Sequence, residues 1–119
     1  MPVRGLTFVA IRPSSLRAAL ELAAANAALG GRARVFCQGE AVAALADLRD
    51  PHDADYAGCG LPTLAALFEA ALGLGVELIA CQSGLALMGV GADALDRRIG
   101  FGGAVSVLQT LGEDRLVTG

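Results

Sequence analysis

Short apolar segments with the length of β-strands recur along the chain, and each is separated from the next by a segment typical of a helix. The apolar segments are largely unbroken, which indicates strands buried on both faces of a parallel sheet. The expected strands are Leu6–Ile11 (LTFVAI), Ala33–Gly39 (ARVFCQG), Val76–Ala80 (VELIA) and a closing strand in the segment Asp114–Thr118 (DRLVT).

The segments between these strands carry helix signals. The first follows Pro13, Ser14 and Ser15, which offer a turn and an N-cap, and it stops at Gly30 and Gly31. Strands that alternate with helices predict an α/β fold: three α/β/α layers, a four- or five-stranded parallel sheet and right-handed crossovers. The expected helices are Leu16–Leu29, Glu40–Leu48, Thr63–Gly75, Gln82–Met88 and a last one that starts at Gly102 and Gly103.

The length of 119 residues suits one domain, so we predict a single domain over residues 1–119. Hydrophobic residues make up 55% of the chain, compared with about 45–50% in ordinary globular domains. We therefore expect a homo-oligomer that hides part of this apolar surface. The polar segment Arg49–Gly60 (RDPHDADYAGCG) is expected to be an exposed loop.

Charge and hydropathy exclude several partners. The net charge is −3, Trp is absent and Tyr occurs once, so we expect no nucleic-acid binding. Glu69 and Glu77 interrupt the longest apolar stretch, and no membrane span is expected. The N-terminal apolar stretch is too short for a signal peptide, which favours a cytoplasmic protein with free thiols.

Cys81 lies between the strand Val76–Ala80 and the expected helix Gln82–Met88. Ligands of parallel sheets meet the carboxyl ends of strands, and the positive end of a helix dipole favours a thiolate. Gln82 and Ser83 offer hydrogen bonds to the sulfur, and Gly84 would allow a second molecule to approach the backbone. A buried cysteine that only packs is the competing interpretation.

The spacing around Cys81 tests known cysteine chemistries. A phosphatase loop needs an arginine six positions later, where Leu87 stands, and a dithiol motif needs a cysteine where Gly84 stands. His52, the one histidine, lies in the polar segment where a solvated side chain is the commoner case. Ligand spacing predicts no metal site, and we expect no cofactor. Of the cysteine chemistries considered, the one that remains is a thiolate that carries sulfur as a persulfide.

The segment GVELIACQSGLALMGVGADALDRRIGFGGAVSVLQTL resembles the DsrE/DsrF-like sulfur-relay proteins, particularly the branch labelled peroxiredoxin-like. The resemblance rests on a strand ending in cysteine, the run Leu-Met-Gly-Val, Leu95 and a Gly-Gly helix start. It implies a sulfur carrier or sulfurtransferase in which Cys81 holds sulfane sulfur between donor and acceptor proteins. It also implies a homo-oligomer.

Two questions stay open at this stage. Cys37 ends a strand at the same sheet edge as Cys81, so it is either a resolving thiol or a residue that only packs. The whole protein is either a sulfur carrier or a non-catalytic homo-oligomeric binding or regulatory protein with the same fold. The exposure of Cys81 would distinguish the two functions.

Overall fold

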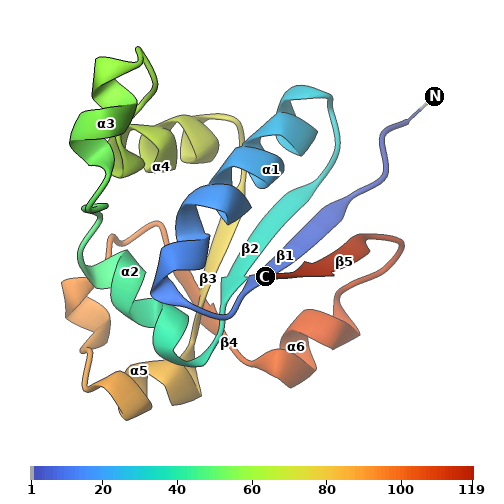
Figure 1. Cartoon of the computed structure of the whole chain (residues 1–119). Coiled ribbons are helices and arrows are strands. Elements are labelled where there is room, and N and C mark those ends of the chain that lie inside the picture. Colours follow the sequence, from blue (N-terminus) through green and yellow to red (C-terminus); the bar gives the residue numbers. More distant parts are fainter. Residues whose placement is uncertain (1) are drawn as a thin grey trace.

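A computed structural model describes residues 2–119 and contains a sheet of five parallel strands in the order β4-β3-β2-β1-β5 (Figure 1). The first strand of the chain lies inside the sheet, between the second strand and the last. The strands are β1 (Leu6–Ala10), β2 (Ala33–Cys37), β3 (Glu77–Cys81), β4 (Gly100–Gly102) and β5 (Arg115–Thr118).

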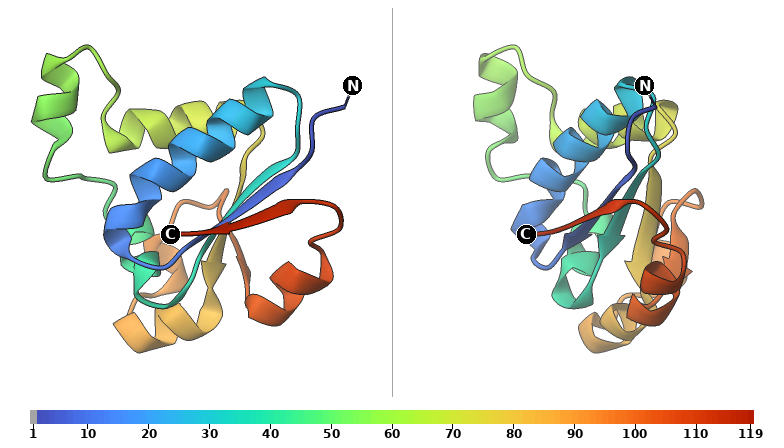
Figure 2. Two further views of the ribbon diagram at one scale, coloured as in Figure 1. Left: turned by 45° about the vertical axis from the view of Figure 1, so that its right-hand side comes forward. Right: turned by 90° about the vertical axis from the view of Figure 1, so that its right-hand side faces the viewer.

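Helices cover the two faces of the sheet unequally. Figure 2 shows α1 and α4 together on one face and α6 on the other, so the predicted three-layer α/β/α fold is confirmed. The helices are α1 (Leu16–Ala28), α2 (Ala43–Ala46), α3 (Asp53–Gly58), α4 (Leu64–Gly73), α5 (Gln82–Met88) and α6 (Ala104–Gln109), with short 3₁₀ turns η1 (Pro13–Ser15), η2 (Gly39–Val42) and η3 (Ala92–Ala94).

Two predicted segments differ from the structure. The segment Arg49–Gly60, expected to be a loop, contains the helix α3, whose carboxylate Asp53 accepts hydrogen bonds from the backbone N–H groups of Asp50 and Leu64. Gly102, expected to begin a helix, ends strand β4 instead, because Gly100–Gly102 pairs with β3. Helix α6 then starts one residue after Gly103.

The core lies between the sheet and the helices α1 and α4. All five residues of β1 and all five of β2 are buried, including the polar Thr7 and Arg34. Apolar residues at helical spacing form one buried stripe on each helix. These residues are Leu16, Ala19, Leu20 and Ala23 of α1, and Leu64, Leu67, Phe68 and Ala71 of α4.

A buried polar network lies between the sheet and α6, beside the core residue Val107. The buried Arg34 donates hydrogen bonds to the hydroxyls of Thr7 (2.9 Å) and Thr110 (2.7 Å) and to the carbonyl of Val107 (3.1 Å). Thr7 donates in turn to the carboxylate of Asp114 (2.8 Å). Burial lowers the pKa of the Arg34 guanidinium, and these partners compensate for its desolvation. The network joins β1 and β2 to α6 and to the start of β5.

Candidate functional site

Cys81 is the last residue of β3, and its register partner in β4 is Gly102. After β3 the chain enters α5, which packs on η2, whereas after β4 it enters α6 on the opposite face of the sheet (Figures 1 and 2). Neighbouring strands whose connections leave toward opposite faces mark the place where ligands of open parallel sheets bind. The sequence prediction of Cys81 at a strand end is thus confirmed.

The Cys81 side chain caps α5. Its Sγ atom accepts a hydrogen bond from the backbone N–H of Gly84 at 3.4 Å, and the side chain is 7% exposed. A backbone N–H directed at sulfur stabilises negative charge on it. The thiol therefore lies just beneath the surface at the carboxyl edge of the sheet, with one donor fixed on it.

Gly84 is required by packing within the chain. A methyl group built at this position would overlap the carbonyl oxygen of Gly39 and lie 3.0 Å from its carbonyl carbon. The first turn of α5 therefore rests directly on the backbone of η2. The space that the missing side chain leaves is occupied by Gly39, and not by a second molecule as the sequence suggested.

Neither Gln82 nor Ser83 supplies the hydrogen bond to the sulfur. Both residues are exposed, and within residues 2–119 neither side chain forms a hydrogen bond with the Sγ atom of Cys81. The N–H of Gly84 takes the role that sequence reasoning gave to these two side chains.

The other two thiols have different environments. Cys37 is 0% exposed, and burial raises the pKa of its thiol to about 12. A thiol that stays protonated and covered cannot attack a disulfide or persulfide, so the structure favours the packing interpretation of Cys37. Cys59 is exposed and follows α3, in the part of the chain that stands apart from the sheet in Figure 1.

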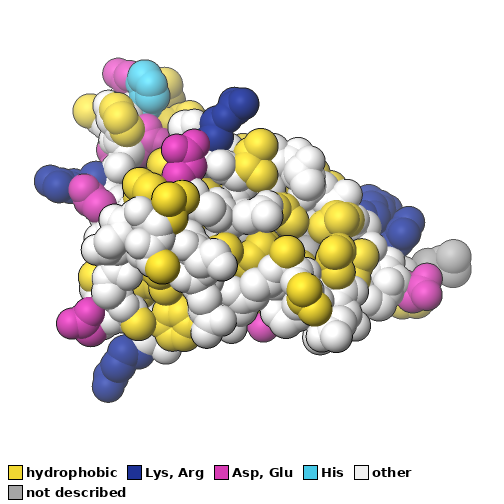
Figure 3. Space-filling view, turned by 90° about the horizontal axis from the view of Figure 1, so that it is seen from below, with side chains coloured by type: hydrophobic (Ala, Val, Ile, Leu, Met, Phe, Trp, Pro, Cys, Tyr) yellow, Lys and Arg dark blue, Asp and Glu magenta, His cyan; other side chains and the backbone are white. Residues whose placement is uncertain are grey.

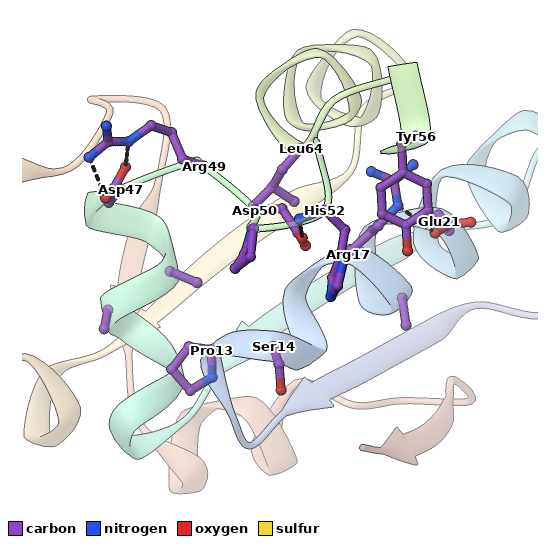
Figure 4. A pocket seen from close by; sticks show the side chains of 14 residues that line it. Pro13, Ser14, Arg17, Glu21, Asp47, Arg49, Asp50, His52, Tyr56 and Leu64 are labelled. Atoms are coloured by element: carbon purple, nitrogen blue, oxygen red, sulfur yellow. Dashed lines mark hydrogen bonds and ion pairs between the residues drawn. The ribbon is translucent and has the colours of Figure 1, made fainter. Parts of the chain in front are cut away.

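Sequence reasoning did not single out Arg17, which borders a cavity of about 580 Å³ (Figure 4). In the sequence Arg17 and Glu21 form an ordinary i,i+4 pair on a helix, which is usually a surface feature. The structure buries the Arg17 side chain beneath Tyr56. No local signal links Arg17 with a tyrosine in a different helix.

Two further properties concern residues 2–119. This part of the chain holds no group of three or more His, Cys, Asp or Glu residues arranged to bind a metal ion. None of its helices has the length and apolar character needed to cross a bilayer.

The comparisons with known proteins agree on the fold. The model of the DsrE/DsrF-like family matches residues 5–118. The crystal structure of the ychN protein from E. coli is similar with a TM-score of 0.67 and 18% sequence identity, over 97% of this chain and 99% of that chain. At this identity the likeness supports the fold alone. No curated protein matches the chain.

Proposed function

Since the chain belongs to the DsrE/DsrF-like family, we propose that it is a sulfur carrier that holds sulfane sulfur as a persulfide on Cys81 and passes it to a partner protein. The observation that carries the proposal is the position of the Cys81 sulfur. It lies at the carboxyl edge of the sheet and accepts the N–H of Gly84 at 3.4 Å. Cys37, by contrast, is fully buried with a raised pKa, and we assign it no sulfur transfer.

The proposed transfer needs no external oxidant or reductant. The Cys81 thiolate attacks the terminal sulfur of a donor persulfide; the new S–S bond forms at Cys81, and the donor leaves as a thiolate. An acceptor thiolate then attacks the terminal sulfur on Cys81 and releases the Cys81 thiolate. The N–H of Gly84 stabilises the thiolate at the beginning and at the end of this cycle.

Mass spectrometry of peptides tests the proposal. Native protein incubated with a persulfide donor should gain one sulfur mass on the peptide that contains Cys81. Cys81→Ser should abolish this gain, whereas Cys59→Ser, which removes an exposed thiol far from the sheet edge, should leave it unchanged. Sulfur found on the Cys59 peptide of the native protein, or on none, would contradict the assignment.

Apolar side chains gather at the same end of the molecule. Leu87 of α5 is 73% exposed and Val105 of α6 is 70% exposed, and Phe101 and Leu108 are also exposed. Figure 3 shows hydrophobic side chains across this end, with charged side chains mostly around its margin. We propose that copies of the chain associate here into a homo-oligomer. Sedimentation that shows only monomer at micromolar concentration would refute this.

One observation favours the alternative function, a non-catalytic homo-oligomeric binding or regulatory protein. Cys81 is only 7% exposed, so little of this residue is accessible to a partner thiol. The persulfide experiment decides between the two functions, because a binding protein would gain no sulfur on Cys81. For a persulfide relay on free thiols we propose the cytoplasm, where thiols stay reduced.

A further inference from the structure

A cavity lies between α1, α2 and the segment that leads into α3, away from Cys81. Its volume of about 580 Å³ falls within the range of about 300–1,000 Å³ that is usual for small-molecule sites. Figure 4 shows Tyr56 over Arg17 and the paired side chains of Asp47 and Arg49 at the opposite side. The walls also include apolar groups, among them Pro13, Ala43 and Leu64.

Arg17 is the group in this cavity whose hydrogen bonds are incomplete. Its side chain is only 7% exposed, and no group within residues 2–119 accepts a hydrogen bond from its Nε or Nη1. Glu21 lies close, with Oε1 3.2 Å from Nε, but not in the direction of a hydrogen bond. A buried guanidinium without acceptors is costly, since charged groups inside proteins are normally paired and hydrogen-bonded.

Tyr56 fixes the plane of this guanidinium. The Arg17 Cζ atom lies 3.4 Å from the centre of the Tyr56 ring, which is the geometry of a stacked cation–π pair. Stacking holds the planar guanidinium in place and leaves its N–H groups for an acceptor in its plane. An arginine held in this way is suited to bind the oxygens of a carboxylate or a phosphate.

Three other charged groups of the cavity, Asp47, Arg49 and Asp50, already have hydrogen-bond partners. Asp47 accepts two hydrogen bonds from Arg49, at 2.8 and 3.0 Å, and Asp50 accepts the backbone N–H of His52 at 2.7 Å. Arg17 differs from them, because the Glu21 carboxylate lies 3.2 Å away but accepts no hydrogen bond from it; an oxyanion would supply the acceptor that Nε and Nη1 lack. The apolar wall residues fit a ligand whose remaining part is a small hydrocarbon body.

We propose that this cavity binds a small organic anion, with its carboxylate or phosphate on Arg17 and its apolar part against Ala43 and Leu64. Cys81 does not border the cavity, so this site is independent of the proposed sulfur chemistry.

Titration followed by ¹⁵N NMR tests the site. Butyrate and butyl phosphate are the two anionic probes, and butanamide is the neutral control of similar shape. Saturable shifts of the amides of residues 13–21 and 43–56 with either anion, and none with butanamide, support the site; the stronger probe identifies the oxyanion. The proposal would be refuted if butanamide caused equal shifts, or if neither anion caused saturable shifts.

Variants separate binding from folding. Arg17→Gln should weaken binding by about tenfold or more, because it removes the charge-assisted hydrogen bonds. Arg12→Gln, at an exposed arginine just before η1, should have no effect, and Glu21→Gln should strengthen binding by removing a competing carboxylate. If Arg17→Gln fails to fold, Arg17→Lys keeps the charge but loses the planar donors and should still weaken binding. Unchanged affinity in the folded Arg17 variant would refute the proposal.

Discussion

The close contact between Gly84 and Gly39 predicts that the substitution Gly84→Ala destabilises the protein. The new methyl group would overlap the Gly39 carbonyl oxygen and lie 3.0 and 3.1 Å from the carbonyl carbon and Cα of the same residue. All three atoms belong to the backbone, so no side-chain rotation relieves the overlap. Helix α5 must move away from η2, and the Gly84 N–H must move with it.

Two opposing contributions to the free energy of unfolding set the size of this effect. Alanine in place of glycine in a helix stabilises by about 0.5–1 kcal/mol. Overpacking costs about 1–3 kcal/mol and more where backbone atoms collide. We therefore expect Gly84→Ala to lower the free energy of unfolding by roughly 1–2 kcal/mol, which corresponds to about 3–5 °C in Tm per kcal/mol for a domain of this size.

Gly73→Ala is the matched control. Gly73 also lies in a helix, at the end of α4, but a methyl group there meets no atom within 4 Å. This variant should be stabilised by about 0.5–1 kcal/mol. Urea unfolding of both variants measures the difference. A Gly84→Ala protein as stable as Gly73→Ala would refute the packing argument.

Three further predictions follow from the polar groups and the buried thiol. Asp114→Ala should destabilise the protein by roughly 3 kcal/mol in urea unfolding, because it leaves the buried charge of Arg34 without its carboxylate. Hydrogen bonds from the backbone N–H groups of Leu64 and Asp50 lower the pKa of Asp53 from its ordinary value, so its stabilisation is present above the pKa of the unfolded chain and is lost as the pH falls through the lower pKa of the folded protein. Fluorescence of Tyr56, the one tyrosine in a chain without Trp, should report this loss, and Asp53→Asn should show no such transition. Cys37 should resist alkylation until the protein unfolds, and rapid labelling in the native state would contradict its burial.

The sequence predicted the strands that consist of apolar runs, because a strand buried on both faces of a sheet is apolar at nearly every position. It did not predict β4, whose residues Gly100–Gly102 are not buried and contain two glycines; this strand exists only through its pairing with β3. The position of Cys81 at a strand end could also be predicted, because the apolar run of β3 stops there.

The partners of buried arginines could not be predicted. Arg34 stands within an apolar strand, and its acceptors Thr110 and Val107 lie more than 70 positions away along the chain. Arg17 looks like half of a surface pair until Tyr56 covers it. A single sequence does not show such distant contacts. The partners of Arg17 and Arg34 could therefore be recognised only in the folded structure.

The pairing of β1 with β5 has a consequence for synthesis on the ribosome. β1 is made first, yet one of its edges has no strand to pair with until residues 115–118 emerge. Throughout translation this edge presents the backbone groups of Leu6–Ala10, an apolar strand, to other nascent chains. A ribosome stalled before residue 115 would thus leave a chain open to edge-to-edge aggregation, and chaperones that cover apolar strands would be needed most at this stage.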